Sequence, residues 1–212
     1  MTRLLPGRVV LFDCDGVLVD SDAAVITAWE RWAIEHGLSA AAVLAVVHGR
    51  RSKDTVTAFL PEPERAAALA QIDRYEVDAA LGVEALPGAR ELLASMPPSA
   101  WAVVTSGRRE LALARIAAAG LPLPAVLITA DDVRRGKPEP EGYLAAAGRL
   151  GAPAGAAVVV EDTAAGIKAA RAAGASAVLG VGPRSVEAAP DAVVADLRAV
   201  SWHEDGLAID VA

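Results

Sequence analysis

The sequence predicts an α/β fold in which a doubly wound parallel sheet carries an inserted, small α-helical domain. Short, continuous apolar runs alternate with helix-like segments of crossover length, which is typical of a parallel sheet covered on both faces. One connection, from Asp15 to Val103, is several times longer than the roughly dozen residues that a crossover needs, so an insertion is expected there. Acidic and polar residues follow several of the apolar runs, where open α/β sheets bind ligands.

The expected strands share a content of β-branched and other apolar residues and are too short to be helices. They cover residues 8–12, 101–104, 126–128, 158–160 and 177–181. The core helices each end before a glycine, the usual left-handed stop. They cover residues 108–119, 140–150 and 164–173.

The long connection contains four helix-like segments and no strand-like run. These segments cover residues 23–36, 40–47, 54–60 and 62–81. We therefore expect a helical cap domain at residues 21–85, and a core domain made of residues 1–20 and 86–212. Such a cap would lie over the carboxyl ends of the strands.

Composition excludes several classes of protein. The 212 residues carry 20 basic and 27 acidic side chains, a formal net charge of -7, so nucleic-acid binding is disfavoured. No apolar stretch approaches the ~20 residues that span a bilayer, and no signal peptide is evident. The single Cys14 offers no internal disulfide, so a cytoplasmic protein without a membrane partner is expected, as a monomer or a weak homo-oligomer.

Two acidic pairs end two of the expected strands. Asp13 and Asp15 follow the first, and Glu161 and Asp162 follow the strand at residues 158–160. Carboxylates this close raise one another's pKa or recruit a cation, and Mg²⁺ prefers such hard oxygen ligands. Each pair alone is more typical of a turn or a helix cap. Together they favour a shared metal site.

Phosphate-binding groups follow two other strands. Thr105, Ser106 and Gly107 open a helix, where a hydroxyl and free backbone N–H groups face any anion. Lys137 lies in a Gly-Lys-Pro turn and is one of few lysines in the chain. Cys14 is interpreted as a buried small apolar residue, because a cysteine phosphatase needs an arginine where this chain has Asp20.

In order, four segments resemble the motifs of the haloacid dehalogenase-like hydrolase superfamily. They are FDCDGVLVDS (12–21), VVTSG (103–107), GKPEP (136–140) and VEDT (160–163). The chain is similar to the helical-cap group that includes sugar and glycerol phosphate phosphatases, phosphoglycolate phosphatase and β-phosphoglucomutase. The resemblance implies a Rossmann-like core and a Mg²⁺-dependent phosphatase that hydrolyses a small sugar or polyol phosphate monoester through an aspartyl phosphate.

The resemblance also implies a role for each matching residue. Asp13 would be the nucleophile, and Asp15 would protonate the leaving alcohol and then activate water. Thr105, Ser106, Gly107 and Lys137 would bind the phosphoryl oxygens. The metal would be held by Asp13, by the backbone carbonyl of Asp15 and by Asp162, with Glu161 as a further ligand or a support behind the ligands.

The expected cap contains one dense polar cluster, which we interpret as the substrate-specificity segment. It consists of His48, Gly49, Arg50, Arg51 and Lys53. Arginine there could recognise hydroxyl groups or anions by forked hydrogen bonds. A solvated loop between helices is an equally weighted interpretation of each residue.

Three alternatives stay open. A mutase of the β-phosphoglucomutase kind would use the same aspartyl phosphate but exclude water from it. A signalling receiver combines similar residues, but lacks the long connection after the first strand. A non-catalytic binding relative of the fold is disfavoured because every motif position holds a competent residue.

Overall fold

Six parallel strands form the central sheet of the computed structural model, which describes residues 2–210. The strand order is β6-β5-β2-β7-β8-β9. Their bounds are β2 (Val9–Phe12), β5 (Trp101–Val104), β6 (Leu127–Ile128), β7 (Ala157–Glu161), β8 (Ala177–Val181) and β9 (Ala192–Val194). In register, Phe12 at the end of β2 pairs with Val103 of β5 and with Val160 of β7. The residues that follow these three strands therefore lie side by side.

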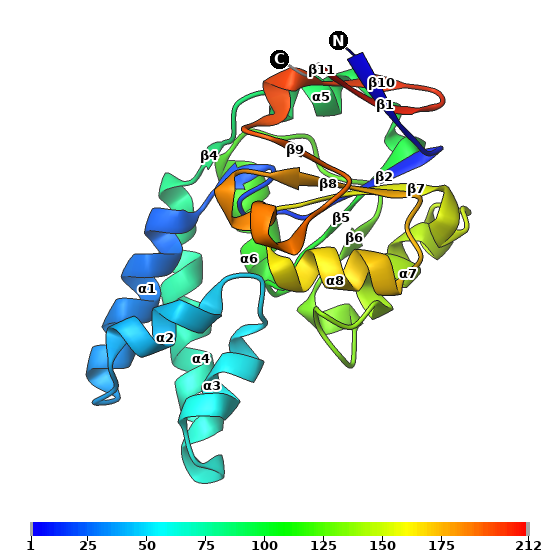
Figure 1. The fold of residues 1–212 in the computed structure, drawn as a ribbon. Coiled ribbons are helices and arrows are strands. Elements are labelled where there is room, and N and C mark those ends of the chain that lie inside the picture. The colour runs from blue at the N-terminus through cyan, green and yellow to red at the C-terminus, as the bar shows by residue number, and fades with distance from the viewer. Residues whose placement is uncertain (1, 211–212) are drawn as a thin grey trace.

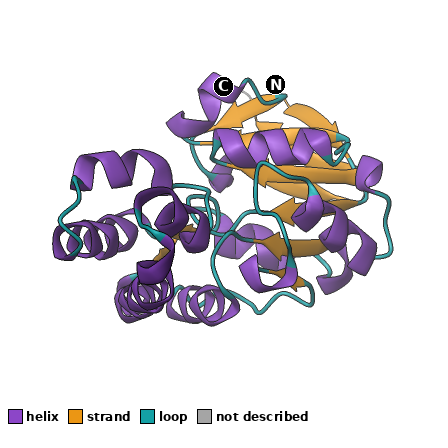
Figure 2. Ribbon diagram, turned by 90° about the horizontal axis from the view of Figure 1, so that it is seen from below, coloured by secondary structure: helices purple, strands orange, loops and turns teal. Residues whose placement is uncertain are grey.

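Helices cover both faces of this sheet (Figure 2). Val10 and Phe12 of β2 join a cluster with α5 and α6, whereas Val9 and Leu11 join a cluster with α7 and α8. The bounds of these helices are α5 (Ala89–Ser95), α6 (Arg109–Ala118), α7 (Glu141–Arg149) and α8 (Ala164–Ala172). Alternate residues of a buried strand thus face opposite helical layers, which confirms the predicted doubly wound α/β fold.

Short 3₁₀ turns connect several of these elements. They are η1 (Ala80–Gly82), η2 (Pro98–Ala100), η3 (Ala130–Asp132), η4 (Ala154–Ala156), η5 (Pro183–Ala188) and η6 (Leu197–Ala199). Among the helices within residues 2–210, none is both long enough and apolar enough to cross a membrane.

Four further helices pack together at one end of the sheet, away from the two termini (Figure 1). They are α1 (Asp22–Glu35), α2 (Ala40–Val47), α3 (Ser52–Phe59) and α4 (Glu62–Ala79). This four-helix unit has its own apolar cluster, in which Trp32 is fully buried and its indole N–H donates to the carbonyl of Ala68. Two chain segments connect this unit to the sheet. They contain the short strands β3 (Val19–Asp20) and β4 (Glu84–Ala85), which pair in antiparallel fashion with each other.

Every strand and helix expected from the sequence is present, with bounds that differ by at most two residues. The expectation lacked α5, β9, the short strands β3 and β4, and a second sheet of antiparallel strands in the order β1-β11-β10. Because β4 lies at residues 84–85, the expectation of no strand within residues 21–85 was wrong at its last two positions. That sheet is formed by β1 (Thr2–Pro6), β10 (Val200–His203) and β11 (Gly206–Asp210), and it holds the two ends of the chain together. Only Leu5 of β1 is buried, so its sequence has no apolar periodicity by which to recognise it.

Candidate active site

Asp13, Thr105 and Asp162 follow the neighbouring strands β2, β5 and β7, and Glu161 ends β7. The backbone N–H of Asp13 donates to the carbonyl of Val160 at 2.9 Å, which fixes Asp13 beside the end of β7. Lys137 enters from the loop after β6. Its ammonium lies 2.8 Å from Asp13 Oδ1 and 2.5 Å from Glu161 Oε1. Residues from separate motifs thus meet at one edge of the sheet.

Glu161 is fully buried and its carboxylate is surrounded by hydrogen-bond donors. Oε1 accepts hydrogen bonds from the Lys137 ammonium and, at 2.9 Å, from the Tyr143 hydroxyl. Oε2 accepts from the backbone N–H groups of Asp162 and Thr163 and from the Thr163 hydroxyl, at 2.9–3.0 Å. Burial raises the pKa of Glu161, but Lys137 and these donors outweigh it and lower the pKa. The carboxylate therefore fixes Lys137 and the turn after β7.

Asp162 is buried with an incomplete set of partners. Its Oδ2 accepts from Arg184 Nε at 3.1 Å and Nη2 at 2.7 Å. Its Oδ1 has no hydrogen-bond partner among the described residues. Burial and the nearby Glu161 raise the pKa of Asp162 to about 7, although Arg184 opposes the shift. Buried polar atoms are normally paired, so an unpaired carboxylate oxygen indicates a missing partner.

A divalent cation fits this place. Asp13, Glu161 and Asp162 each offer an oxygen within 4.8 Å of the others. Burial and then Glu161 raise the pKa of Asp13 well above its usual value, and Lys137 only partly offsets them. The three carboxylates share only Lys137 and Arg184 as described cationic partners, so a bound cation would relieve the repulsion between them. Hard oxygen donors, an unpaired oxygen and excess negative charge are together the chemistry of a Mg²⁺ site.

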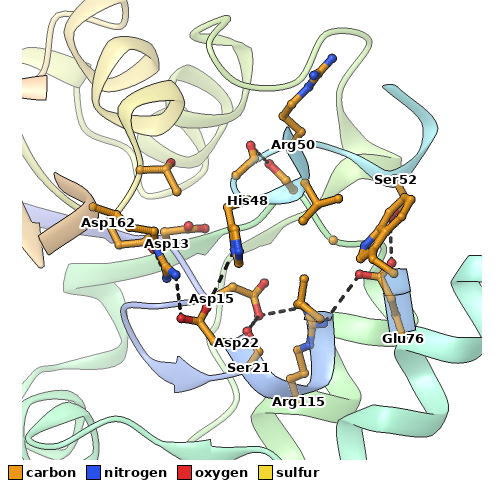
Figure 3. A pocket seen from close by; sticks show the side chains of 18 residues that line it. Asp13, Asp15, Ser21, Asp22, His48, Arg50, Ser52, Glu76, Arg115 and Asp162 are labelled. Carbon is orange, nitrogen blue, oxygen red and sulfur yellow. Dashed lines mark hydrogen bonds and ion pairs between the residues drawn. The ribbon is translucent and has the colours of Figure 1, made fainter. Parts of the chain in front are cut away.

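Asp15 lies between this cluster and a buried arginine (Figure 3). Its Oδ1 accepts from Ser21 Oγ at 2.7 Å and from Arg115 Nη1 at 2.8 Å. Its Oδ2 has only a long contact of 3.4 Å with the Thr105 hydroxyl. Two donors on one oxygen orient the carboxylate and leave the other oxygen available to a ligand. Cys14, between the two aspartates in sequence, is buried in the apolar core, as interpreted from the sequence.

The predicted specificity segment divides into two parts. His48, Gly49 and Arg50 line one cavity with Asp13, Asp15 and Asp162. Gly49 has a φ of +71°, and a Cβ there would lie 2.7 Å from the Thr163 hydroxyl oxygen, so a glycine lets this loop approach the core. Its carbonyl accepts from Ser106 Oγ at 2.9 Å. The exposed Arg50 side chain points away from the aspartates (Figure 3).

Arg51 and Lys53 do not line that cavity. Arg51 binds both oxygens of Asp54, at 2.8 and 2.9 Å, and its Nη1 donates to the backbone carbonyl of Arg134 at 2.9 Å. It therefore joins the four-helix unit to the loop that carries Lys137. Lys53 is exposed on α3.

Several residues that line the cavity belong to none of the four sequence motifs and lie outside the predicted specificity segment. They are Asp22, Ser52, Glu76, Arg115 and Arg184. Arg115 is buried on the same face of α6 as the apolar Leu111, Ala112 and Ile116. A charged residue on the apolar face of a helix is a signal that could have identified it.

Comparison with known proteins settles the family. The model of the haloacid dehalogenase-like hydrolases matches residues 8–174. Hexitol phosphatase A of Escherichia coli is 44% identical over 169 residues, 77% of this chain and 78% of that protein. The 2-deoxyglucose-6-phosphate phosphatase 2 of Saccharomyces cerevisiae is 34% identical over 231 residues, covering 95% and 94%. The chain belongs to the haloacid dehalogenase-like hydrolases.

A solved structure supports the same assignment. A hydrolase from Pseudomonas syringae superposes with a TM-score of 0.78 at 26% identity, covering 89% of this chain and 93% of that one. As the motifs predict, the protein is an enzyme of the phosphoric monoester hydrolase class.

Proposed function

We propose that the protein is a Mg²⁺-dependent phosphatase that hydrolyses a small sugar or polyol phosphate through an aspartyl phosphate. The observation that carries the proposal is the position of Asp13. Its carboxylate lies 2.8 Å from the Lys137 ammonium and in the same acidic cluster as Asp162, in a cavity that Asp15 also lines. The curated relatives named above are phosphatases of phosphorylated hexitol and sugar compounds, which favours this substrate class.

In the first step, a carboxylate oxygen of Asp13 attacks phosphorus and the bond to the ester oxygen breaks. Such transfer depends mainly on in-line placement and on neutralising the charge of the phosphoryl oxygens. Lys137, the Thr105 hydroxyl and the backbone N–H of Ser106 supply the donors that bind those oxygens. The Gly107 N–H donates to the Thr105 hydroxyl oxygen at 3.0 Å and so orients that hydroxyl. The hydrogen bonds of Glu161 keep Lys137 in position for this task.

Asp15 moves the protons. Ser21 and Arg115 hold Oδ1, so Oδ2 is the oxygen that gives a proton to the leaving alcohol. The same oxygen then takes a proton from the water that hydrolyses the aspartyl phosphate. A carboxyl group fixed on one side by two donors suits a residue that changes from acid to base within one turnover.

Asp13, Asp162 and the backbone carbonyl of Asp15 would hold the metal, with Glu161 behind them rather than in direct contact. Both Glu161 oxygens already accept hydrogen bonds, whereas Asp162 Oδ1 accepts none among the described residues. When bound, Mg²⁺ supplies positive charge that offsets the repulsion between the nucleophile and the phosphate dianion.

Residues 21–85 would act as a cap domain over this site. The four-helix unit contributes one wall of the cavity through His48, Gly49 and Arg50, and the sheet contributes the aspartates. Substrate selection would then come from side chains of the unit that line the cavity. Arg51 and Lys53 would act outside it.

The test is a panel of phosphate esters assayed for released inorganic phosphate with Mg²⁺ present. The panel contains hexitol, hexose and glycerol phosphates. We expect release from at least one of them, and loss of release when the metal is chelated. Interconversion of sugar phosphate isomers without release would replace the phosphatase by a mutase, and inactivity on the whole panel would overturn the proposal.

A further inference from the structure

A second polar group faces the same cavity from the side opposite to Asp13 and Asp162 (Figure 3). It consists of Ser52 of α3, Glu76 of α4 and Arg115 of α6, and we name it the hydroxyl end. Glu76 and Arg115 are buried, with side chains 8% and 3% exposed. Charged residues are almost never buried to this extent unless they are paired.

The pairing between these two charges is incomplete. Glu76 Oε2 accepts from Ser52 Oγ at 2.8 Å, but Oε1 lies 3.8 Å from Arg115 Nη2, too far for a hydrogen bond. Within residues 2–210, Arg115 Nε and Nη2 are buried without a hydrogen-bond partner. A buried donor left in this state destabilises the folded protein. Such a group in a cavity indicates a ligand that completes it.

One uncharged hydroxyl group can form hydrogen bonds with both Glu76 Oε1 and Arg115 Nη2. A separation of 3.8 Å between an acceptor and a donor is compatible with one bridging atom about 2.8 Å from each of them. A hydroxyl donates its proton to Glu76 Oε1 and accepts from Arg115 Nη2, using both of its hydrogen-bonding functions. A carboxylate there would be repelled by Glu76, and an ammonium group by Arg115.

The position relative to Asp15 indicates where on the substrate this hydroxyl lies. Arg115 binds Asp15 Oδ1 through Nη1 and faces Glu76 through Nη2. Asp15 serves the ester oxygen, so a group held by Nη2 lies one guanidinium width farther along the substrate. That distance corresponds to the carbon chain near the phosphate ester.

We propose that Glu76, anchored by Ser52 and opposed by Arg115, is a specificity-determining residue that selects phosphate esters with an uncharged, hydroxyl-bearing chain. The inference rests on the proposed phosphatase function and assigns its selection of polyol and sugar phosphates to a single residue. Esters whose second group is a carboxylate, such as phosphoglycolate, are poor substrates by the same geometry. The selectivity then resides in residues of α3, α4 and α6 and not in the strand-end motifs.

The test compares sorbitol 6-phosphate with propyl phosphate, which has no hydroxyl on its chain. In the wild type, kcat/KM for the sorbitol ester exceeds that for propyl phosphate. Glu76→Gln keeps the shape of the side chain but loses the charged acceptor, so the ratio of the two kcat/KM values falls about tenfold or more. The loss comes from the sorbitol ester, while propyl phosphate changes by less than about threefold. Phosphoglycolate, included as a third ester, becomes a relatively better substrate.

The matched control is Asp78→Asn, which removes the same charge from an exposed position on α4. It leaves kcat/KM for both esters unchanged. If Glu76→Gln does not unfold cooperatively, Ser52→Ala serves as the second variant, because loss of the anchor lowers the same ratio by a few-fold. An equal loss of kcat/KM for both esters in Glu76→Gln, or an unchanged ratio of the two kcat/KM values in both Glu76→Gln and Ser52→Ala, overturns the inference. A wild type that hydrolyses both esters equally overturns only this inference, whereas one that hydrolyses neither overturns the proposed function with it.

Discussion

The cavity has two ends that differ in how completely their polar groups are paired. At the strand ends, Glu161 accepts from Lys137, Tyr143 and the turn after β7, and Lys137 also binds Asp13. At the hydroxyl end, Arg115 has two buried nitrogens without partners among the described residues, and Glu76 is 3.8 Å away. Apart from Asp162 Oδ1, which is left for the metal, the first end is organised before a substrate arrives, whereas the second would be completed by the substrate.

The two ends also differ in how the chain builds them. Asp13, Thr105 and Asp162 each follow a parallel strand, so the sheet alone brings them together. Glu76 and Arg115 lie on helices of different units and meet only because α4 packs against α6. On the proposed assignment, substrate selection could therefore change through Glu76 without disturbing the residues proposed to transfer the phosphoryl group. The following predictions test this separation.

The largest effect is expected from Asp13→Asn. An amide cannot form the aspartyl phosphate, so phosphate release falls by about a thousandfold or more on every ester. The substitution also removes one buried negative charge, and burial and Glu161 already raise the pKa of Asp13. The free energy of unfolding is therefore not reduced. Phosphate release and urea unfolding measure the two effects, and activity retained within about tenfold would rule out Asp13 as the nucleophile.

Lys137→Met tests the pairing at the strand ends. It leaves Glu161 and Asp13 without their shared cation, and breaking a buried ion pair costs about 3–5 kcal/mol. Urea unfolding measures this loss of stability. Lys168→Met, at an exposed position of α8, is the control and changes the free energy of unfolding by less than about 0.5 kcal/mol. Equal stability of the two variants would show that Lys137 is not required to compensate the carboxylates.

Mg²⁺ should stabilise the folded enzyme through the same cluster. At a free concentration about 100-fold above its Kd, a ligand that binds only the folded state adds about 2.7 kcal/mol, which raises Tm. Asp162→Asn weakens the site at its unpaired oxygen and reduces this increase. Thermal unfolding with and without Mg²⁺ measures this increase in Tm. The reference sample contains a chelator in Ca²⁺-free buffer. The same Tm increase in Asp162→Asn would place the metal elsewhere.

The separation of the two ends also explains what the sequence could predict. Asp13, Thr105 and Asp162 could be recognised because a polar residue directly after a parallel strand lies at a known edge of the sheet. Lys137 could be recognised only by its Gly-Lys-Pro motif, because it lies in a loop. Glu76 could not be placed, because the packing of α4 against α6 depends on contacts between residues far apart in the chain. The strands β1 and β11 were missed for a similar reason. Their pairing joins residues 2–6 to residues 206–210, and β1 shows no apolar alternation.

Arg51→Ala tests a contact between the units, and a smaller effect is expected. The substitution removes the hydrogen bond from Nη1 to the Arg134 carbonyl and the fork to Asp54. A hydrogen bond contributes about 0.5–1.5 kcal/mol, so kcat/KM falls by roughly tenfold at most. Because Arg51 does not line the cavity, the loss is similar for sorbitol 6-phosphate and propyl phosphate. A loss confined to the sorbitol ester would instead make Arg51 a residue that selects substrate.

Lys53→Ala is expected to have the smallest effect, although the sequence places Lys53 in the same polar cluster as His48 and Arg50. Lys53 is exposed at the start of α3 and does not line the cavity that holds Asp13. Exposed substitutions change stability by about 0.5 kcal/mol or less, and kcat/KM for both esters should stay within about twofold. Steady-state kinetics of Lys53→Ala, compared with the kinetics of Arg51→Ala, measure the difference. A loss as large as that of Arg51→Ala would show that exposed charge on α3 also attracts the phosphate ester, so selection would extend beyond the cavity wall.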